Sequence, residues 1–192
     1  MTVAVFGGTF NPPHNGHLIV AESVRDTLRL GLVLFIPSAR SPHKGMQSLA
    51  PAEDRLAMTR LAVEGNAGFT ASDMEIARGG TSYTVDTLKE VSRLYPGSPV
   101  KLLIGADNLF DFEGWKSPRE ILNLADLVVL TRPGFDPPSA HSGFLERASV
   151  VTVPQVGISG TDVRRRVKFK QSIRYMVPPA VEEYIRRRGL YK

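Results

Sequence analysis

Short apolar blocks and helical patterns alternate along nearly the whole chain. The predicted strands are mainly apolar blocks, and they cover residues 2–6, 32–36, 69–76, 100–104, 127–130 and 149–153. The predicted helices carry apolar residues three and four positions apart, and they cover residues 17–28, 52–64, 84–94, 115–124, 161–167 and 179–188. Strands that are apolar throughout are typical of a parallel sheet with both faces covered. The pattern therefore predicts an α/β protein with a doubly wound parallel sheet.

The same pattern predicts one domain. The chain has 192 residues and shows no repeat, linker or break in composition, and an average domain has roughly 100–200 residues. We expect a single Rossmann-like domain over residues 1–192, with a C-terminal helical part at about 159–190 that packs on it. Ligands of such sheets bind beyond the carboxyl ends of the strands. The segments of interest therefore follow Phe6, Ile36, Ile104, Leu130 and Val153.

Composition excludes several functional classes. The chain has no cysteine, which rules out a disulfide framework, a cysteine–zinc site and a thiol nucleophile. The first residues lack the basic and long apolar regions of a secretory signal. No apolar run approaches the roughly 20 residues that span a bilayer. We therefore expect a soluble, cytoplasmic protein.

Positive charge is concentrated near the C-terminus. Residues 161–192 contain ten Lys or Arg and three Asp or Glu, a net charge of +7, whereas the whole chain carries +5. A basic segment serves a nucleic acid, a membrane surface or a phosphate-rich ligand, or it forms a solvated helix face. Charge alone leaves these alternatives open.

The loop after the first strand has the composition of an anion site. Its sequence, GGTFNPPHNGH, covers residues 7–17, and its paired glycines let the backbone approach a ligand closely. A helix opens near residues 15–17, where free N–H groups and the positive end of the helix dipole suit a phosphate. His14 and His17 are spaced so that both rings could face that phosphate. A tight Gly-Pro turn with a polar cap is an equally good interpretation of the spacing alone.

The segment after the last strand forms a second candidate anion site. Residues 157–166 place the Ser159 and Thr161 hydroxyls at a helix start and Arg164 on its first turn. Taken alone, this pattern is better explained as a helix cap followed by an exposed basic helix. Two such sites on the first and last units of one sheet could hold a polyphosphate from two sides.

Six segments resemble a known family in the same order. GGTFNPPHNGH resembles the (H/T)xGH opening of the nucleotidyltransferase superfamily, and ISGTDVR resembles its second ATP-binding motif, ISSTxxR. The four segments between them resemble bacterial nicotinate mononucleotide adenylyltransferases: SPHK at 41–44, SYTVDTL at 82–88, GADNLFDFEGW at 105–115 and TRPG at 131–134. The resemblance covers residues 3 to about 188. Asn11 replaces a commoner Asp, and Gly160 replaces a commoner Ser, which removes one hydroxyl donor.

The resemblance implies adenylyl transfer from ATP to nicotinate mononucleotide, which gives deamido-NAD and pyrophosphate. The mononucleotide phosphate is already an anion, so no side chain must deprotonate the nucleophile. Catalysis then rests on positioning two anions and stabilising the charge on the transferred group. Mg²⁺ would bind mainly through the ATP phosphates, so we expect no protein metal site.

The resemblance also implies roles for individual residues. The catalytic set is His14, His17, Lys44 and Arg164. The ATP-binding set is Gly7, Gly8, Thr9, Phe10, Gly105, Asp107, Arg132, Ile158, Ser159 and Thr161. The mononucleotide-binding set is His43, Tyr83, Thr84 and Trp115, with Trp115 as a stacking platform for the nicotinate ring and Thr84 at a helix N-terminus that suits the carboxylate. Without the resemblance, Lys44 would be interpreted as a solvent-exposed lysine and Trp115 as a core residue.

Three other functions remain open. Phosphopantetheine adenylyltransferase shares the opening motif, but its family has Thr where this chain has His14. A preference for nicotinamide mononucleotide differs from the favoured function by one charge. A nucleic-acid-binding protein would use the basic C-terminal segment, although no recognised binding module is present. We expect ATP and nicotinate mononucleotide as partners, no nucleic acid or membrane, and leave a homo-oligomer open.

Overall fold

The computed structural model of the protein describes residues 1–40, 49–109, 111–131 and 148–192. Its described residues form a six-stranded, all-parallel sheet in the order β3-β2-β1-β4-β5-β6. The strands are β1 (Val3–Gly8), β2 (Leu32–Pro37), β3 (Phe69–Ala71), β4 (Val100–Gly105), β5 (Asp126–Thr131) and β6 (Ala148–Thr152). The order reverses between β1 and β4, as in doubly wound folds. The predicted fold class is therefore confirmed.

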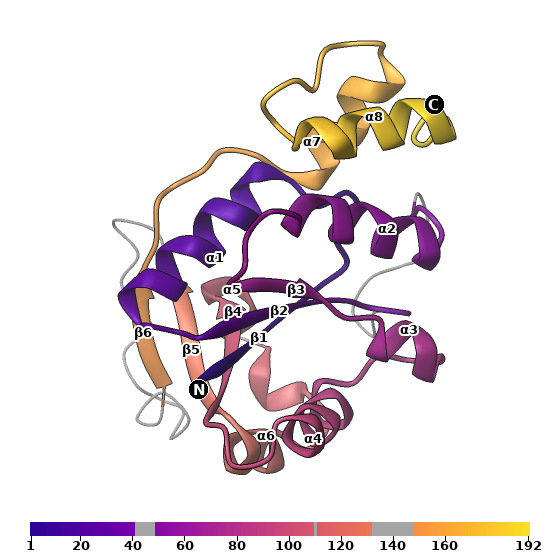
Figure 1. Cartoon of the computed structure of the whole chain (residues 1–192). Helices are drawn as coiled ribbons and strands as arrows, with labels where there is room; N and C mark the ends of the chain where they lie inside the picture. The colour runs from indigo at the N-terminus through magenta and orange to yellow at the C-terminus, as the bar shows by residue number, and fades with distance from the viewer. Residues whose placement is uncertain (41–48, 110, 132–147) are drawn as a thin grey trace.

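Helices cover both faces of this sheet (Figure 1). They are α1 (Asn15–Thr27), α2 (Ala52–Val63), α3 (Met74–Arg78), α4 (Thr84–Leu94), α5 (Ala106–Leu109), α6 (Pro118–Leu124), α7 (Gly160–Lys168) and α8 (Pro179–Arg188), with a short 3₁₀ helix η1 at Phe112–Gly114. Successive strand residues point to opposite faces. Val3 and Val5 accordingly pack with α4 and α6, whereas Ala4 packs with α1. This is why the strands are apolar throughout.

The C-terminal helices form a separate layer beside α1 and α2 (Figure 1). A third apolar cluster joins them to the rest of the fold, with Met58 and Ala62 from α2 packed against Val163 of α7 and Val181 and Ile185 of α8. No helix among the described residues is long and apolar enough to cross a membrane.

Three predictions of local structure are wrong: the strand at 69–76, the helix at 115–124, and Thr84 as the N-cap expected from its side-chain hydroxyl at the start of the helix at 84–94. The predicted strand at 69–76 stops at Ala71, because Ser72 and Asp73 start a turn in which the Ser72 hydroxyl accepts the Met74 N–H, and α3 follows. Thr84 is the first residue of α4 rather than its cap, which is Tyr83. The helix predicted at 115–124 begins only at Pro118, the first residue of α6, where a proline fits the first turn. Trp115 precedes this helix and has an extended backbone.

Candidate functional site

Two cavities lie at the carboxyl ends of β1 and β4, where the strand order reverses. The first, here called the tryptophan cavity, has about 290 Å³ and is lined by Val5 and Gly7 of β1, by Ser82–Thr84 at the start of α4, and by Trp115. The second, the histidine cavity, has about 580 Å³ and is lined by Phe6, His14, His17, Asp107 and Ile158, among others. Val5 and Gly7 of β1 line the tryptophan cavity, whereas Phe6 between them lines the histidine cavity, so the strand end separates the two cavities.

The start of α1 builds one wall of the histidine cavity. His14 caps the helix, and the rings of His14 and His17 stack with centroids 3.6 Å apart and planes 23° apart. The backbone N–H of His14 donates to Nδ1 of His17 over 3.1 Å. A ring nitrogen that accepts carries no proton, which places the ring proton of His17 on Nε2. Edge contacts with Phe6 and Phe10 fix the plane of the His17 ring.

His14 is buried and uncharged at neutral pH. Only 7% of the residue is exposed, and burial lowers the pKa of its imidazole to about 4. Among the described residues its Nδ1 has no hydrogen-bond partner. A Cβ on Gly16 would lie 3.0 Å from that nitrogen, so the small residue lets the helix backbone pass beneath the ring. The cavity wall therefore combines a helix N-terminus with two neutral imidazoles.

Gly105, the last residue of β4, and Asp107 form another wall of the histidine cavity. A Cβ on Gly105 would collide with Oδ1 of Asp107, because the carboxylate folds back over the end of the strand. A side chain at this position would push the Asp107 carboxylate aside, whereas glycine lets it stay over the strand end. Both residues line the histidine cavity and place one carboxylate there.

The tryptophan cavity gathers most of the predicted mononucleotide set. Tyr83, Thr84 and Trp115 all line it, together with the backbone of Gly7–Thr9. Trp115 is half-buried against Phe112, with ring centroids 5.3 Å apart. The Tyr83 side chain does not cap α4, whose first N–H groups have no partner within the helix. An aromatic face and a helix N-terminus thus meet in one cavity.

Glu75 is a buried carboxyl group in this cavity that sequence reasoning missed. Its Oε1 accepts a 2.6 Å hydrogen bond from the Thr87 hydroxyl, which in turn accepts one from Arg78. Burial raises the pKa of Glu75, and the hydrogen bonds oppose that shift. Placing residues 69–76 in a strand hid this residue, because α3 is what turns it toward the cavity. A Glu inside an apolar stretch was the available signal.

The residues of the second predicted motif, 157–166, are divided between two cavities and a helix cap. Ser159 caps α7 by accepting the Asp162 N–H, and its hydroxyl donates to the Asp162 carboxylate over 2.8 Å. Arg164 donates from Nη1 to the carbonyl of Asn11 over 2.8 Å and from Nη2 to the Thr161 hydroxyl. Of this motif, Ile158 lines the histidine cavity, whereas Thr161 and Arg164 line a neighbouring one. The contact with Asn11 joins the two motifs.

The two departures from the family motifs, Asn11 and Gly160, are neighbours in space. A Cβ on Gly160 would lie 3.0 Å from the Asn11 carbonyl oxygen and 3.4 Å from Nη1 of Arg164. A side chain at this position would force the Asn11 carbonyl or Arg164 to move by a few tenths of an ångström. Glycine therefore leaves room for the hydrogen bond between Arg164 and Asn11.

Comparison with known proteins agrees with this geometry. Residues 5–166 match the cytidylyltransferase-like family. The chain is 44% identical over 192 residues to a Salinibacter ruber protein named a probable nicotinate-nucleotide adenylyltransferase, covering all of this chain and 98% of that one. A Thermus thermophilus protein of the same name is also 44% identical, over 196 residues and the full length of both chains.

The chain belongs to the nicotinate-nucleotide adenylyltransferase family.

Its fold also matches a solved structure of that activity. The Plasmodium falciparum nicotinic acid mononucleotide adenylyltransferase complexed with NaAD superposes with a TM-score of 0.79 over 99% of this chain and 97% of that one. The identity is 17%, so this likeness establishes the fold alone.

Three of the predicted site residues, His43, Lys44 and Arg132, lie outside the residues that the structure describes. Gly7, Gly8, Thr9, Tyr83, Thr84 and Trp115 line the tryptophan cavity, and His14, His17, Gly105, Asp107 and Ile158 line the histidine cavity. Ser159, Thr161 and Arg164 lie at the start of α7, and Phe10 is buried against His17. Their contacts with substrates stay predictions.

Arg55 is a second residue that sequence reasoning missed in this nicotinate-nucleotide adenylyltransferase. It lies on α2 with 2% of its surface exposed. Its guanidinium donates to three backbone carbonyls, those of Thr9 (2.8 Å), Ala39 (3.2 Å) and Ala50 (3.1 Å). It therefore ties the glycine-rich loop to the segment after β2. The sequence signal for a buried arginine was the position of Arg55 next to Leu56, which faces inward on the helix.

Proposed function

We propose that the chain transfers the adenylyl group of ATP to nicotinate mononucleotide, giving deamido-NAD and pyrophosphate. The observation that carries this proposal is the pair of cavities separated by the glycine end of β1. A dinucleotide forms where two nucleotide phosphates meet, and the backbone of Gly7–Thr9 offers a place for that meeting. Family membership supports the same reaction.

ATP would occupy the histidine cavity. The N-terminus of α1 and the ring of His17, which lines the cavity, would supply hydrogen-bond donors for its phosphates, and a donor held in place before the reaction need not reorganise during it. Asp107 would accept hydrogen bonds from a ribose hydroxyl. Gly7, Gly8, Thr9 and Phe10 would approach the phosphates through the backbone, and Ser159, Thr161 and Arg164 would hold the leaving pyrophosphate from α7.

Nicotinate mononucleotide would occupy the tryptophan cavity. The indole of Trp115 would stack on the pyridine ring, and the first N–H groups of α4 at Thr84 would receive the carboxylate. The nucleotide phosphate would then point toward the β1 end and attack the α-phosphorus of ATP. Because that phosphate is already ionised, the reaction needs no general base.

Mg²⁺ would accompany ATP rather than a protein site. The histidine cavity offers two imidazoles and one carboxylate, that of Asp107, whereas Mg²⁺ prefers several oxygen ligands. The described residues contain no group of three or more His, Cys, Asp or Glu that could hold a metal ion. The ion fits this site through phosphate oxygens, where it would neutralise charge on the triphosphate.

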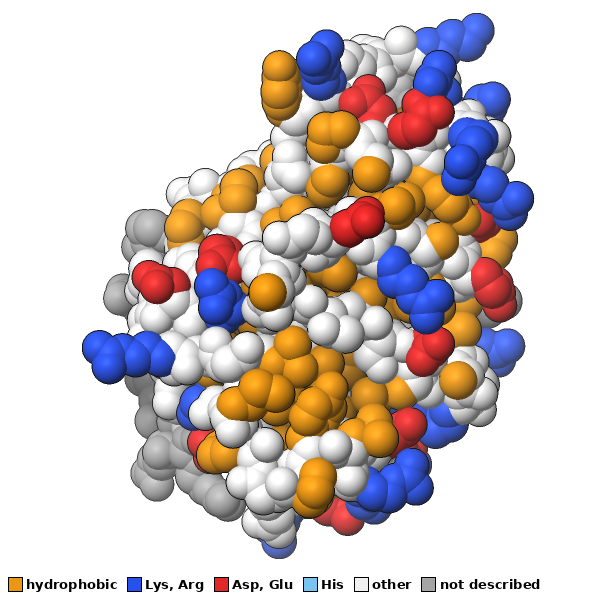
Figure 2. Space-filling model, in the orientation of Figure 1, with side chains coloured by type: hydrophobic (Ala, Val, Ile, Leu, Met, Phe, Trp, Pro, Cys, Tyr) orange, Lys and Arg blue, Asp and Glu red, His pale blue; other side chains and the backbone are white. Residues whose placement is uncertain are grey.

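The basic C-terminal segment fits a solvated helix face better than a nucleic-acid surface. Lys and Arg side chains gather over α7 and α8 in the space-filling view (Figure 2). Several of these cations already pair with carboxylates: Arg165 with Asp162, Arg186 with Glu183, and Arg188 with Asp54. We propose no nucleic-acid partner on this basis.

A substrate comparison tests the proposal. The purified protein is incubated with ATP, Mg²⁺ and one acceptor, either nicotinate mononucleotide, nicotinamide mononucleotide or phosphopantetheine, and pyrophosphate and the nucleotide product are measured. We expect the highest kcat/KM with nicotinate mononucleotide and deamido-NAD as the product. Pyrophosphate release with phosphopantetheine alone would refute the proposal.

A further inference from the structure

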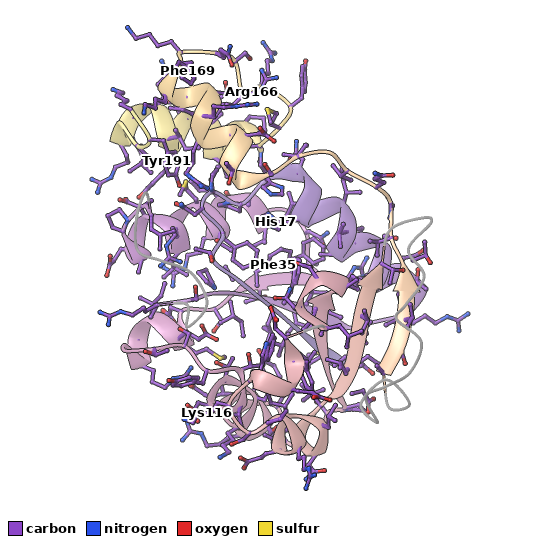
Figure 3. All side chains as sticks on the ribbon, turned by 180° about the vertical axis from the view of Figure 1, so that it is seen from behind. His17, Phe35, Lys116, Arg166, Phe169 and Tyr191 are labelled. Carbon is purple, nitrogen blue, oxygen red and sulfur yellow. The ribbon has the colours of Figure 1, made fainter. Side chains whose placement is uncertain are left out.

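The C-terminal tail reaches the glycine-rich loop through one hydrogen bond. The hydroxyl of Tyr191, three residues beyond α8, donates to Oδ1 of Asn11 over 2.8 Å. Figure 3 shows Tyr191 where the C-terminal helices meet the rest of the molecule. Burial raises the pKa of the Tyr191 phenol, so it remains protonated and can donate. The two residues are 180 positions apart in the sequence.

Asn11 is the point at which four segments meet. Its Oδ1 accepts the Ala50 N–H over 3.0 Å as well as the Tyr191 hydroxyl, and its carbonyl oxygen accepts from Arg164. The residue is 6% exposed and lies three positions before His14. The path of the loop into α1 therefore depends on these hydrogen bonds.

We propose that Tyr191 is a positioning residue for adenylyl transfer, which through Asn11 holds the loop before His14 and the Arg164 guanidinium in the arrangement that binds the ATP phosphates. This role rests on the proposed function. Tyr191 touches neither cavity of the proposed active site, and lines with Arg164 the cavity beside it. Its effect should therefore fall on ATP and spare nicotinate mononucleotide, whose cavity lies on the other side of β1.

Tyr184 provides a matched control in the same layer of the molecule. Its hydroxyl donates to Oδ1 of Asp54 over 2.7 Å, a bond of the same kind and length as that of Tyr191. Asp54 keeps a second partner, Arg188, and within the described part of the chain the hydrogen bonds of Tyr184 and Asp54 do not reach the loop before His14. Tyr184→Phe therefore removes one tyrosine hydroxyl from the C-terminal layer without acting on Asn11.

The experiment compares Tyr191→Phe, Tyr184→Phe and the parent by steady-state kinetics and thermal unfolding. We expect Tyr191→Phe to lower kcat/KM for ATP about tenfold, the usual effect of one lost hydrogen bond, with KM for nicotinate mononucleotide within about twofold. Tyr184→Phe should keep the parent's kinetics, and both variants should unfold at similar temperatures. Equal kinetic losses in the two variants, or equal losses for both substrates, would overturn the role.

A double-mutant cycle tests the route through Asn11. In an Asn11→Ala background, Tyr191→Phe should add less than a twofold further loss, because its partner atom is already gone. An undiminished tenfold loss in that background would overturn the proposal. An active parent with an unaffected Tyr191→Phe variant would refute this role alone, whereas an inactive parent would refute the proposed function and the role with it.

Discussion

The imidazole rings of His14 and His17 lie face to face, with centroids 3.6 Å apart, and the backbone N–H of His14 donates to Nδ1 of the His17 ring. The His14 N–H fixes the tautomer of His17 and leaves its Nε2–H as a donor in the histidine cavity. His14 lies deeper and stays neutral because charging a buried ring is costly. The pair thus presents donors without a permanent charge.

His17→Ala should lower kcat by roughly 10²–10³-fold, because a donor aimed at charge that develops in the transition state has an effect of this size. The half-buried ring makes edge contacts with Phe6 and Phe10 that contribute little beyond packing, so the melting temperature should fall by only a few degrees. Turnover and thermal unfolding of the same preparation check both statements. Near-normal turnover in the folded variant would contradict the role of His17 at the phosphates.

The buried ring of His14 should make stability depend on pH. Its pKa is about 4 in the folded protein and 6.5 in the unfolded chain, so between these values the unfolded chain binds more protons. The free energy of unfolding should therefore rise with pH from about 4 to 6.5 and level off above, with a contribution of about 3 kcal/mol. Urea unfolding at several pH values measures this slope.

His14→Asn provides the comparison for that measurement. Asparagine does not titrate, so the variant should lose the His14 part of the slope while other groups contribute equally to both proteins. Parallel pH profiles for parent and variant would show that His14 does not titrate as its burial requires.

Strands and helices were largely predictable from the sequence because apolar residues report burial locally. The run Leu32–Ile36 can be buried on both faces only inside a sheet, and β2 confirms it. Residues 69–76 are also predicted as one strand, but they mix apolar and polar side chains, and Ser72 and Asp73 end the pairing with β2 after Ala71. These turn-forming side chains set the end of the strand, which the hydrophobic pattern alone does not predict.

The residues that organise the site were harder to predict because their partners are remote. Arg55 acts on the carbonyl of Thr9, 46 positions away, and Tyr191 acts on Asn11, 180 positions away. No local pattern encodes such contacts. Loops at strand ends, by contrast, could be assigned to the site in advance, since the topology of a parallel sheet brings them together.

Arg55→Met should destabilise the protein by about 3 kcal/mol. The substitution keeps an apolar stem but leaves the carbonyls of Thr9, Ala39 and Ala50 without their buried donor, and each unpaired group is costly. Arg60→Met is the control on the same helix, because Arg60 is exposed and makes a surface ion pair with Asp73. Urea unfolding should show a change below about 1 kcal/mol for Arg60→Met, and equal losses in the two variants would contradict the role of Arg55.

Gly160→Ser should impair the enzyme even though it restores the commoner motif residue. The new Cβ would press on the Asn11 carbonyl and on Arg164, whose hydrogen bond joins the two phosphate motifs. We expect KM for ATP to rise about tenfold, with KM for nicotinate mononucleotide little changed. Initial rates at varied ATP measure this. A lower KM for ATP would show instead that the added hydroxyl binds phosphate and that Asn11 yields easily.

Substrate preference should depend on α4 more than on Trp115. The nicotinate and nicotinamide rings stack alike, so stacking cannot distinguish them, whereas the carboxylate only accepts hydrogen bonds and the carboxamide also presents an NH₂ donor. In the proposed binding mode, the first N–H groups of α4, beside Thr84, would satisfy the carboxylate but would face that NH₂ with further donors. One mispaired buried group costs about 1–3 kcal/mol, which corresponds to a preference of roughly ten- to hundredfold for nicotinate mononucleotide.

Trp115→Ala separates stacking from this discrimination. Removing the indole should lower kcat/KM for both mononucleotides by about tenfold or more, since one stacked ring contributes on the order of 1–3 kcal/mol. The ratio between the two substrates should stay within about threefold of the parent's ratio, because the N-terminus of α4 is unchanged. Measuring kcat/KM for both mononucleotides in parent and variant decides the point. If the ratio collapses toward one in Trp115→Ala, the indole itself orients the carboxylate, and the discrimination assigned to α4 is wrong.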